Sequence, residues 1–315
     1  MTQFRGIFGI LTASYKEDMS LDEKSVRSQV DFCVKAGSHG IVVPVNASEF
    51  IVLSDEERKD IIRFTVEQAA GRVPVIAGVT TQSTYQSVEF AAYAGKIGAD
   101  GLIAMPPYGA RATDDEIVEF YKRIGDAGRI PVFIQNYIPP VGTAMSPSLC
   151  VRIMQEADYA SYIKEETQYS SQVIAEIARL AEILPKEKYL GTMGGKAGRY
   201  LIDEYHRGVC GNMPACDIVD IDAKIWNLLE EGKEKEAIAL YNQAIPLMNM
   251  EYMYGYVLYK AVLKKRGIID CDSVRVPGGK RLDKFDYTEL DRILKELEPY
   301  YQVLSQEGYN SQAVG

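Results

Sequence analysis

Eight short apolar segments recur along the first two-thirds of this 315-residue chain, and they constrain its fold more than any other feature. Each segment lacks polar alternation and is too short for a helix, and most have Gly or Pro at a boundary. A strand that is buried on both faces of a parallel sheet has this pattern. The segments are 6–12, 40–45, 74–78, 101–105, 131–136, 159–164, 189–193 and 208–213.

Amphipathic segments with helix-entry signals separate the apolar segments. Ser20 and Glu23 have the spacing of a capping box, and so do Ser54 and Glu57. Strict alternation of strand and helix, repeated around eight strands, predicts a (β/α)8 TIM barrel. The expected helices are 21–36, 53–70, 83–97, 114–127, 146–156, 170–184 and 196–206.

The chain beyond the eighth apolar segment contains no strand candidate. Helices are expected over 217–232, 233–250, 251–267 and 287–305, with breaks at Gly232, near Pro246 and at the turn 277–279. These helices carry too little apolar surface to form a core alone. We therefore predict a barrel over 1–220 that carries the active site, and a helical region over 221–315 that packs on the barrel or at a subunit interface.

Composition and charge argue against several classes of function. A formal charge of −9 and a pI near 5.0 argue against nucleic acid as a partner. No segment approaches the ~20 apolar residues that span a bilayer, and the N-terminus lacks signal-peptide architecture, so no membrane partner is expected. The five cysteines are scattered without CxxC spacing, which favours reduced thiols and a cytoplasmic location.

Few residues suit metal or cofactor chemistry. The two histidines, His39 and His206, do not stand at ligand spacing from a second His or a Cys pair. The glycine-rich stretch 191–197 fails the Walker phosphate-binding pattern. Two interpretations of this stretch stay open. It could place an anionic substrate group near Lys196 and Arg199, or it could form a tight turn with solvated charges. We expect neither a metal ion nor a cofactor.

Lys164 is the strongest candidate for a catalytic residue. It ends the sixth apolar segment and is followed by Glu165 and Glu166. Burial disfavours a charged amine and lowers its pKa, so an amine at this place can attack a carbonyl carbon and form an imine. A lysine that only leaves the core for solvent is the alternative. Its position on a barrel strand favours the Schiff base, because barrel active sites lie at the carboxyl ends of the strands.

These motifs resemble the dihydrodipicolinate synthase and N-acetylneuraminate lyase family of class I aldolases, over essentially the full chain. The most specific match is Ile163-Lys164-Glu165-Glu166-Thr167, which resembles the imine-lysine signature of that family. Supporting matches are 74–78, 105–108, 131–136 and Gly142. The second-strand motif of the family appears here as 45–49, with only its glutamate, Glu49, retained.

The resemblance implies a 2-oxo acid substrate that is held as an imine on Lys164. It also implies assembly, because the tyrosine that matches Tyr108 reaches an active site across a subunit interface in the family. The family commonly forms a dimer of dimers, so we expect a homo-oligomer.

Several positions depart from the family pattern. A proton-shuttling tyrosine is replaced by Gln135, and two threonines that support the substrate carboxylate become Asn46 and Ala47. The arginine that receives the second substrate of the synthase would align with Pro140. The resemblance therefore implies little or no dihydrodipicolinate synthase activity.

Strand parity identifies two residues that could replace the missing tyrosine. Side chains alternate along a strand, so Glu166 shares a side with Lys164, and Tyr137 shares a side with Gln135. Glu166 could act as a general base at C3 of a ketimine or as an acid toward a leaving hydroxyl. Tyr137 could assist, or it could only line the mouth of the barrel.

We expect Lys164, Glu166, Tyr137 and Tyr108 to be catalytic. The expected substrate-binding residues are Asn46, Ala47, Gln135, Gly194 and Met213. The predicted function is a Schiff-base lyase that releases pyruvate by retro-aldol cleavage or dehydrates a 2-keto-3-deoxy sugar acid. Two alternatives stay open: condensation on pyruvate of the 4-hydroxy-tetrahydrodipicolinate synthase type, and a non-catalytic barrel that binds a 2-oxo acid.

Overall fold

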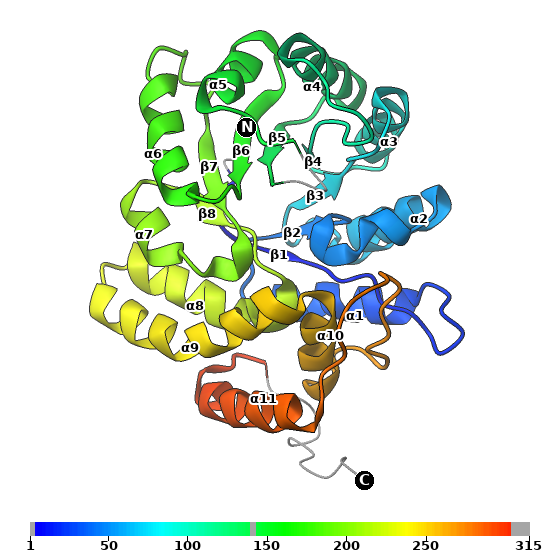
Figure 1. The fold of residues 1–315 in the computed structure, drawn as a ribbon, viewed down its shortest axis with the longest axis vertical. Coiled ribbons are helices and arrows are strands. Elements are labelled where there is room, and N and C mark those ends of the chain that lie inside the picture. Colours follow the sequence, from blue (N-terminus) through cyan, green and yellow to red (C-terminus); the bar gives the residue numbers. More distant parts are fainter. Residues whose placement is uncertain (1–3, 139–142, 304–315) are drawn as a thin grey trace. The chain divides into compact units, whose positions relative to one another are not determined.

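The computed structural model describes residues 4–138 and 143–303, and in it eight parallel strands close into a barrel in the order β1 to β8 (Figure 1). Pro140 and Gly142, which the family comparison singles out, lie outside the described residues. The strands are β1 (Gly6–Ile10), β2 (Gly40–Val43), β3 (Val75–Gly78), β4 (Gly101–Ala104), β5 (Val132–Asn136), β6 (Ala160–Glu165), β7 (Gly191–Gly194) and β8 (Gly211–Asn212). All eight predicted strands are confirmed.

Helices alternate with these strands as the sequence predicts. They are α1 (Glu23–Lys35), α2 (Asp55–Ala69), α3 (Thr84–Lys96), α4 (Asp114–Gly128), α5 (Pro147–Glu156), α6 (Ser170–Ala181) and α7 (Leu201–His206). The C-terminal region adds α8 (Val219–Glu230), α9 (Glu234–Tyr254), α10 (Tyr256–Lys265) and α11 (Lys284–Leu297). The predicted (β/α)8 barrel with a helical C-terminal extension is therefore confirmed.

The chain divides into two compact units, of which the first comprises 1–6 and 74–213. Within it, helices α3 to α6 lie on the outer side of strands β3 to β7 (Figure 1). The ring of Phe133 on β5 stacks on Tyr162 of β6 with ring centroids 4.6 Å apart, and Phe4 packs against both rings. Tyr162 stands two residues before Lys164 on the same side of its strand, so this aromatic cluster packs next to the candidate lysine.

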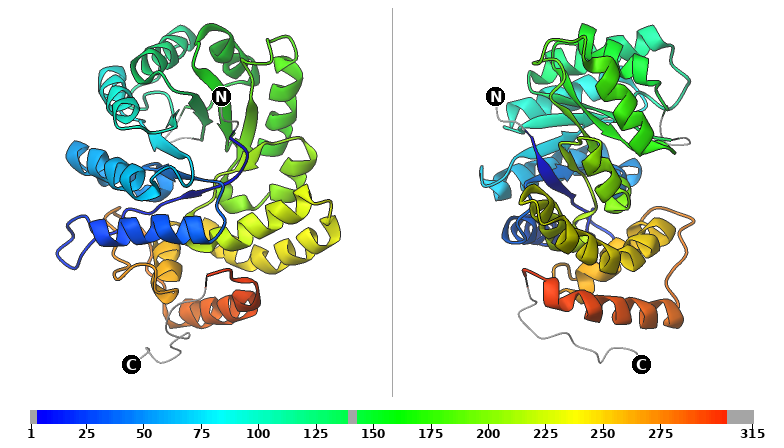
Figure 2. Two further views of the ribbon diagram at one scale, coloured as in Figure 1. Left: turned by 180° about the vertical axis from the view of Figure 1, so that it is seen from behind. Right: turned by 90° about the vertical axis from the view of Figure 1, so that its left-hand side faces the viewer.

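The second unit comprises 7–73 and 214–315. In it α8 and α9, drawn in yellow, lie side by side, and α9 also contacts α10 and α11 (Figure 2). The predicted division into a barrel of 1–220 and a helical region of 221–315 remains a prediction.

Two expectations about the start of α1 and the end of α9 are wrong. The first concerns the start of α1, whose N-cap is Asp22 and not Ser20, because the Asp22 side chain accepts a hydrogen bond from the Lys24 N–H. Ser20 instead donates its hydroxyl hydrogen to Asp18. The capping box of Ser54 and Glu57 is present.

The second correction concerns Pro246, which lies inside α9 and does not end it. The break comes at Gly255, where φ is +53° and ψ is −125°, a conformation that is open to glycine and costly for other residues. No helix in the part of the chain that the structure describes combines the length and the apolar character needed to cross a membrane.

Candidate active site

Lys164 lies on β6 with only 2% of its surface exposed, and its Nζ is 3.0 Å from Oε2 of Glu166. Glu166 follows the end of the strand and is 6% exposed. Strand parity predicts this proximity, since the two residues are two positions apart on one strand. Both side chains are shielded from water, so the ammonium group and the carboxylate mainly compensate each other's charge.

Gln135 holds the carboxylate of Glu166 in place. It lies on β5 opposite Lys164 in the pairing with β6, and its Nε2 donates a 2.8 Å hydrogen bond to Oε2 of Glu166. An amide therefore orients a carboxylate at the position where the resemblance implies a tyrosine. Oε1 of Gln135 is buried and has no hydrogen-bond partner among the described residues.

Glu165 points away from Lys164 and has a structural role. Its carboxylate accepts hydrogen bonds from Asn136 Nδ2 at 2.7 Å and from the N–H and hydroxyl of Thr167. Asn136 in turn bonds both the N–H and the carbonyl of Met145. Burial raises the pKa of Glu165, while its hydrogen bonds to Thr167 and Asn136 lower it. Glu165 therefore links the end of β6 to the segment that follows β5.

Two consecutive glycines at the end of β7 form a wall next to Glu166. A Cβ on Gly195 would collide with the carboxylate of Glu166, so only glycine leaves room for it. The carbonyl of Gly194 accepts a hydrogen bond from the N–H of Met213 at 3.0 Å. The structure therefore brings Gly194 and Met213 together, and their role in substrate binding remains a prediction.

Lys196 is anchored to the segment that follows β6, and a role in binding an anionic group remains a prediction. Its Nζ donates a 2.6 Å hydrogen bond to the carbonyl of Thr167 and lies 5.6 Å from the ring centre of Tyr200. Burial lowers the pKa of Lys196, while the charges of Glu166 and Glu165 oppose that effect. The predicted continuous helix over 196–206 is wrong, because Lys196 and Ala197 have φ values of +52° and +58° and α7 begins only at Leu201.

Glu204 on α7 is a buried residue near the site. The sequence analysis did not predict it. It is 1% exposed and accepts hydrogen bonds from the hydroxyl of Ser170 and from Nδ2 of Asn212, each at 3.1 Å. Burial raises the pKa of Glu204 to about 7. Its spacing of three residues from the buried Leu201 places it on the inner face of α7, and this spacing is the signal that could have identified it.

Asn46 and Ala47 lie in the second unit, in a 3-10 turn (Asn46–Ser48) that follows β2. Nδ2 of Asn46 is buried and has no hydrogen-bond partner among the described residues. Glu49 ends this turn in the left-handed region, with φ of +54°. The turn therefore presents one unpaired donor, which is a feature that a ligand oxygen could satisfy.

Glu49, which the family pattern retains, anchors that turn. Its carboxylate forms a fully buried ion pair with Lys260 of α10 and accepts the N–H groups of Arg275 and Val276 at 2.8 and 2.9 Å. Desolvation lowers the pKa of Lys260, and the charge of Glu49 raises it. The structure therefore explains the retained glutamate as a support for the loop that carries Asn46.

Tyr108 follows β4 and Tyr137 follows β5, and both are partly exposed. Their catalytic roles remain predictions.

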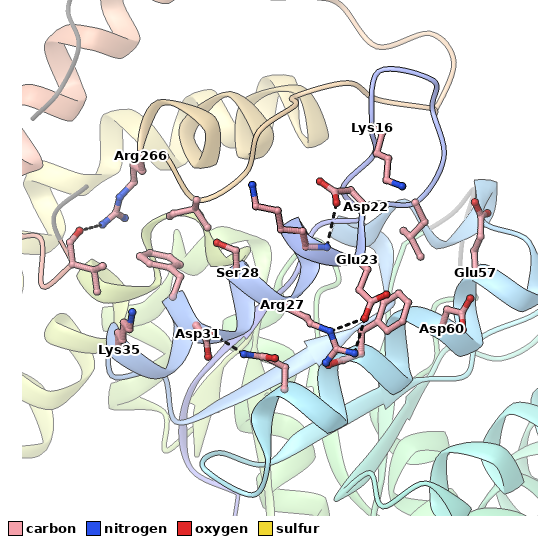
Figure 3. A pocket seen from close by; sticks show the side chains of 18 residues that line it. Lys16, Asp22, Glu23, Arg27, Ser28, Asp31, Lys35, Glu57, Asp60 and Arg266 are labelled. Atoms are coloured by element: carbon pink, nitrogen blue, oxygen red, sulfur yellow. Dashed lines mark hydrogen bonds and ion pairs between the residues drawn. The ribbon is translucent and has the colours of Figure 1, made fainter. Parts of the chain in front are cut away.

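An open groove of about 1160 Å³ lies in the second unit, between α1 and α2 and the chain after α10 (Figure 3). Several of its charged side chains form ion pairs. Arg27 pairs with Glu23 and Glu67, and Arg266 pairs with Asp220. Because these ion pairs compensate many of the charges in the groove, we place the candidate active site at Lys164.

Comparison with known proteins places the site in a family context. Residues 3–297 match the model of the dihydrodipicolinate synthetase family. The chain is 32% identical over 299 residues to an L-2-keto-3-deoxyarabonate dehydratase of Azospirillum brasilense, which covers 94% of this chain and 95% of the relative. It is 34% identical over 249 residues to a 4-hydroxy-tetrahydrodipicolinate synthase of Bradyrhizobium diazoefficiens, with 79% and 81% covered.

Solved structures agree with these matches. A putative dihydrodipicolinate synthetase from Pseudomonas aeruginosa superposes with a TM-score of 0.86 at 25% identity, over 93% of this chain and 99% of that one. A dihydrodipicolinate synthase from Rhodopseudomonas palustris superposes with a TM-score of 0.84 at 24% identity, over 93% and 97%.

Proposed function

Because the chain belongs to the dihydrodipicolinate synthetase family of enzymes, we propose that it is a Schiff-base lyase that dehydrates a 2-keto-3-deoxy sugar acid. The observation that carries the proposal is the buried pair of Lys164 Nζ and Glu166 Oε2, 3.0 Å apart. It supplies a nucleophile for C2 of the substrate and, beside that nucleophile, a group that can transfer protons at C3 and at the C4 hydroxyl.

Imine formation comes first. Lys164 must lose a proton before it can attack C2 of the substrate, and the carboxylate of Glu166 is within reach to accept that proton. The resulting carbinolamine loses hydroxide as water when Glu166 returns the proton. The product of this step is an iminium ion in which C2 is bonded to Nζ of Lys164.

Elimination follows from the same pair. The iminium group acidifies the hydrogens on C3, and Glu166 removes one of them to give an enamine. The electron pair of the enamine then expels the C4 hydroxyl, which leaves as water with the proton that Glu166 took. In a five-carbon conjugated imine a proton is then lost from C5 and a proton is added at C3, which leaves an enol between C4 and C5. Tautomerisation of this enol gives an aldehyde at C5. Hydrolysis of the imine releases the product and restores the amine of Lys164, so the net change is the loss of one water molecule.

Gln135 supports this chemistry in two ways. Its Nε2 fixes the carboxylate of Glu166, and its partnerless Oε1 is a buried acceptor at the same place. We propose that a substrate hydroxyl donates to this oxygen. A site with a buried acceptor rejects a ligand that lacks the matching hydroxyl, because the acceptor then stays unpaired.

Two observations favour dehydration over the other reactions of the family. One relative that matches nearly the full chain is a dehydratase, and Glu166 provides an acid and base where Gln135 stands in place of the usual tyrosine. Retro-aldol cleavage is the second candidate, because it uses the same imine. In that reaction the base removes the proton of the C4 hydroxyl and not a proton of C3.

The product of a five-carbon 2-keto-3-deoxy acid tests the proposal. Both C4 epimers would be incubated with the enzyme and with Lys164→Ala. Dehydration retains all five carbons and creates an aldehyde at C5, whereas retro-aldol cleavage gives pyruvate and a two-carbon aldehyde. Pyruvate as the main product would assign the lyase to carbon–carbon cleavage. Turnover only with pyruvate and aspartate semialdehyde would assign a synthase, and binding without any turnover would assign a sensor.

A further inference from the structure

Gly194 and Gly195 separate two buried carboxyl groups at the end of β7. A Cβ on Gly195 would collide with Glu166, and a Cβ on Gly194 would collide with Oε2 of Glu204. Glu166 arrives from β6, whereas Glu204 arrives from α7. The two carboxyl groups are therefore neighbours across two residues of backbone that carry no side chains.

Asn212 connects the two sides of this backbone. Its Nδ2 donates to Oε2 of Glu204 at 3.1 Å and lies 3.4 Å from the carbonyl oxygen of Gly195. Glu204 also accepts the hydroxyl hydrogen of Ser170 at 3.1 Å. Both hydrogen-bond donors are neutral, so they do not compensate a negative charge on Glu204 as an ammonium group would.

Two charged groups act on Glu204 from neighbouring elements. The negative charge of Glu166 favours the protonated form of Glu204, and the positive charge of Lys196 opposes this effect. Burial is the largest cause that favours protonation, and the pKa of Glu204 is about 7 as a result. A carboxyl group with this pKa changes its charge in the range where enzymes work.

We propose that Glu204 is a positioning residue that acts through Glu166: it is protonated in the active form and supports the Gly194–Gly195 wall against the Glu166 carboxylate. When Glu204 loses its proton, a second negative charge stands behind that wall. The repulsion between the two charges displaces the Glu166 carboxylate from the position in which it delivers a proton to the leaving hydroxyl. This inference rests on the proposed dehydration, and it adds a second carboxyl group that controls the first.

The first test is the pH dependence of turnover in the wild type and in Glu204→Gln. Glutamine keeps the size of a protonated glutamate and stays neutral. We expect kcat of the wild type to fall as pH rises through about 7, and this descending limb to move up by about one pH unit or more in the variant. Below pH 6 the two kcat values should agree within about threefold. The exposed Glu182→Gln on the same unit should keep the wild-type profile.

The second test needs no activity. Infrared difference spectra, or carbon NMR of labelled glutamate, should show a carboxyl that titrates near pH 7 and is missing in Glu204→Gln. In Glu166→Gln the midpoint of that carboxyl should fall, because the neighbouring negative charge is gone. A midpoint that Glu166→Gln leaves unchanged, or superimposable pH profiles in the first test, would overturn the coupling. If the midpoint shifts but no 2-oxo acid is turned over, the coupling holds and the proposed dehydration fails.

Discussion

Nε2 of Gln135 lies 2.8 Å from Oε2 of Glu166, the same oxygen that lies 3.0 Å from Nζ of Lys164. One carboxylate oxygen thus accepts a hydrogen bond from an amide on β5 and forms an ion pair with an ammonium group on β6. Gln135 stands where the resemblance to the family implies a proton-shuttling tyrosine, and its amide cannot titrate near neutrality. We therefore propose that Glu166 transfers protons and that Gln135 sets the direction in which its carboxylate points.

Lys164→Ala should abolish covalent trapping of the substrate. Borohydride with pyruvate should add a pyruvate-derived mass to the wild type and none to the variant, because only a neutral amine forms the imine. Intact-protein mass spectrometry measures the adduct. Lys196→Ala is the matched control, since Lys196 is a half-buried lysine in the same unit, and it should keep the adduct. An adduct on the Lys164 variant would place the nucleophile elsewhere.

Glu166→Gln should separate imine formation from turnover. The amine remains, and borohydride traps the imine irreversibly even when the imine forms slowly without Glu166, so pyruvate should still be trapped on Lys164 over a long incubation. Turnover should fall by about two orders of magnitude or more, because the group that moves protons at C3 is gone. If trapping and turnover both stay near the wild type, Tyr137 or Tyr108 becomes the candidate for proton transfer. Loss of folding and of the adduct together would instead indicate a structural role.

Gln135→Leu should lower kcat by about 10- to 100-fold, since a hydrogen bond to a charged group contributes about 1.5 to 3 kcal/mol. Leucine has a similar volume but no donor for the carboxylate of Glu166. Steady-state kinetics and a circular dichroism melt measure the two effects separately. Gln172→Leu, at an exposed position of α6, serves as the control and should change neither. Unchanged kcat in Gln135→Leu would remove the orienting role.

We expect the protein to form at least a dimer. The reason is Tyr108, since the resemblance to the family implies that this tyrosine acts across a subunit interface. Sedimentation velocity at several protein concentrations should show a dimer or a tetramer. Tyr108→Phe should keep the assembly and lower turnover, since it removes only the hydroxyl. A monomer with full activity would contradict a role across an interface.

Asp222→Asn should stabilise the protein more at pH 8 than at pH 5. Asp222 of α8 is fully buried, and neither of its carboxyl oxygens has a hydrogen-bond partner among the described residues. Burial raises the pKa of Asp222 well above its usual range, and the charges of Asp217 and Asp220 add to this effect. The folded protein therefore binds a proton that the unfolded chain releases, and stability falls as pH rises above the unfolded pKa of about 4.

Asparagine stays neutral and avoids this loss. We expect a gain of about 1 kcal/mol or more at pH 8, or roughly 2 °C in Tm, and a smaller gain at pH 5. Calorimetry at both pH values measures it. Asp270→Asn is the control, because Asp270 is exposed on the surface, and its effect should be small at both pH values. Equal changes in Tm at the two pH values would show that Asp222 is not the titrating group.

The sequence alone determined the barrel and the proximity of Lys164 and Glu166, because both depend on short-range periodicity. Buried parallel strands and amphipathic helices differ over a few residues, so their alternation could be predicted. Strand parity could likewise place Glu166 beside Lys164. Helix ends were less predictable, because tertiary contacts select among equivalent local signals. Tyr15 pairs with Leu21 and the N–H of Asp22 bonds to Ser14, which leaves Asp22, and not Ser20, at the N-cap of α1.

Only the tertiary structure determined how distant residues meet around Glu166. The bond from Gln135 depends on the register of β5 against β6, across 31 residues of sequence. Glu204 reaches the wall of Gly194 and Gly195 because α7 begins five residues late, after a turn at Lys196 and Ala197 with positive φ. Burial also raises the pKa of Glu204, and burial is a property of packing that no local pattern contains.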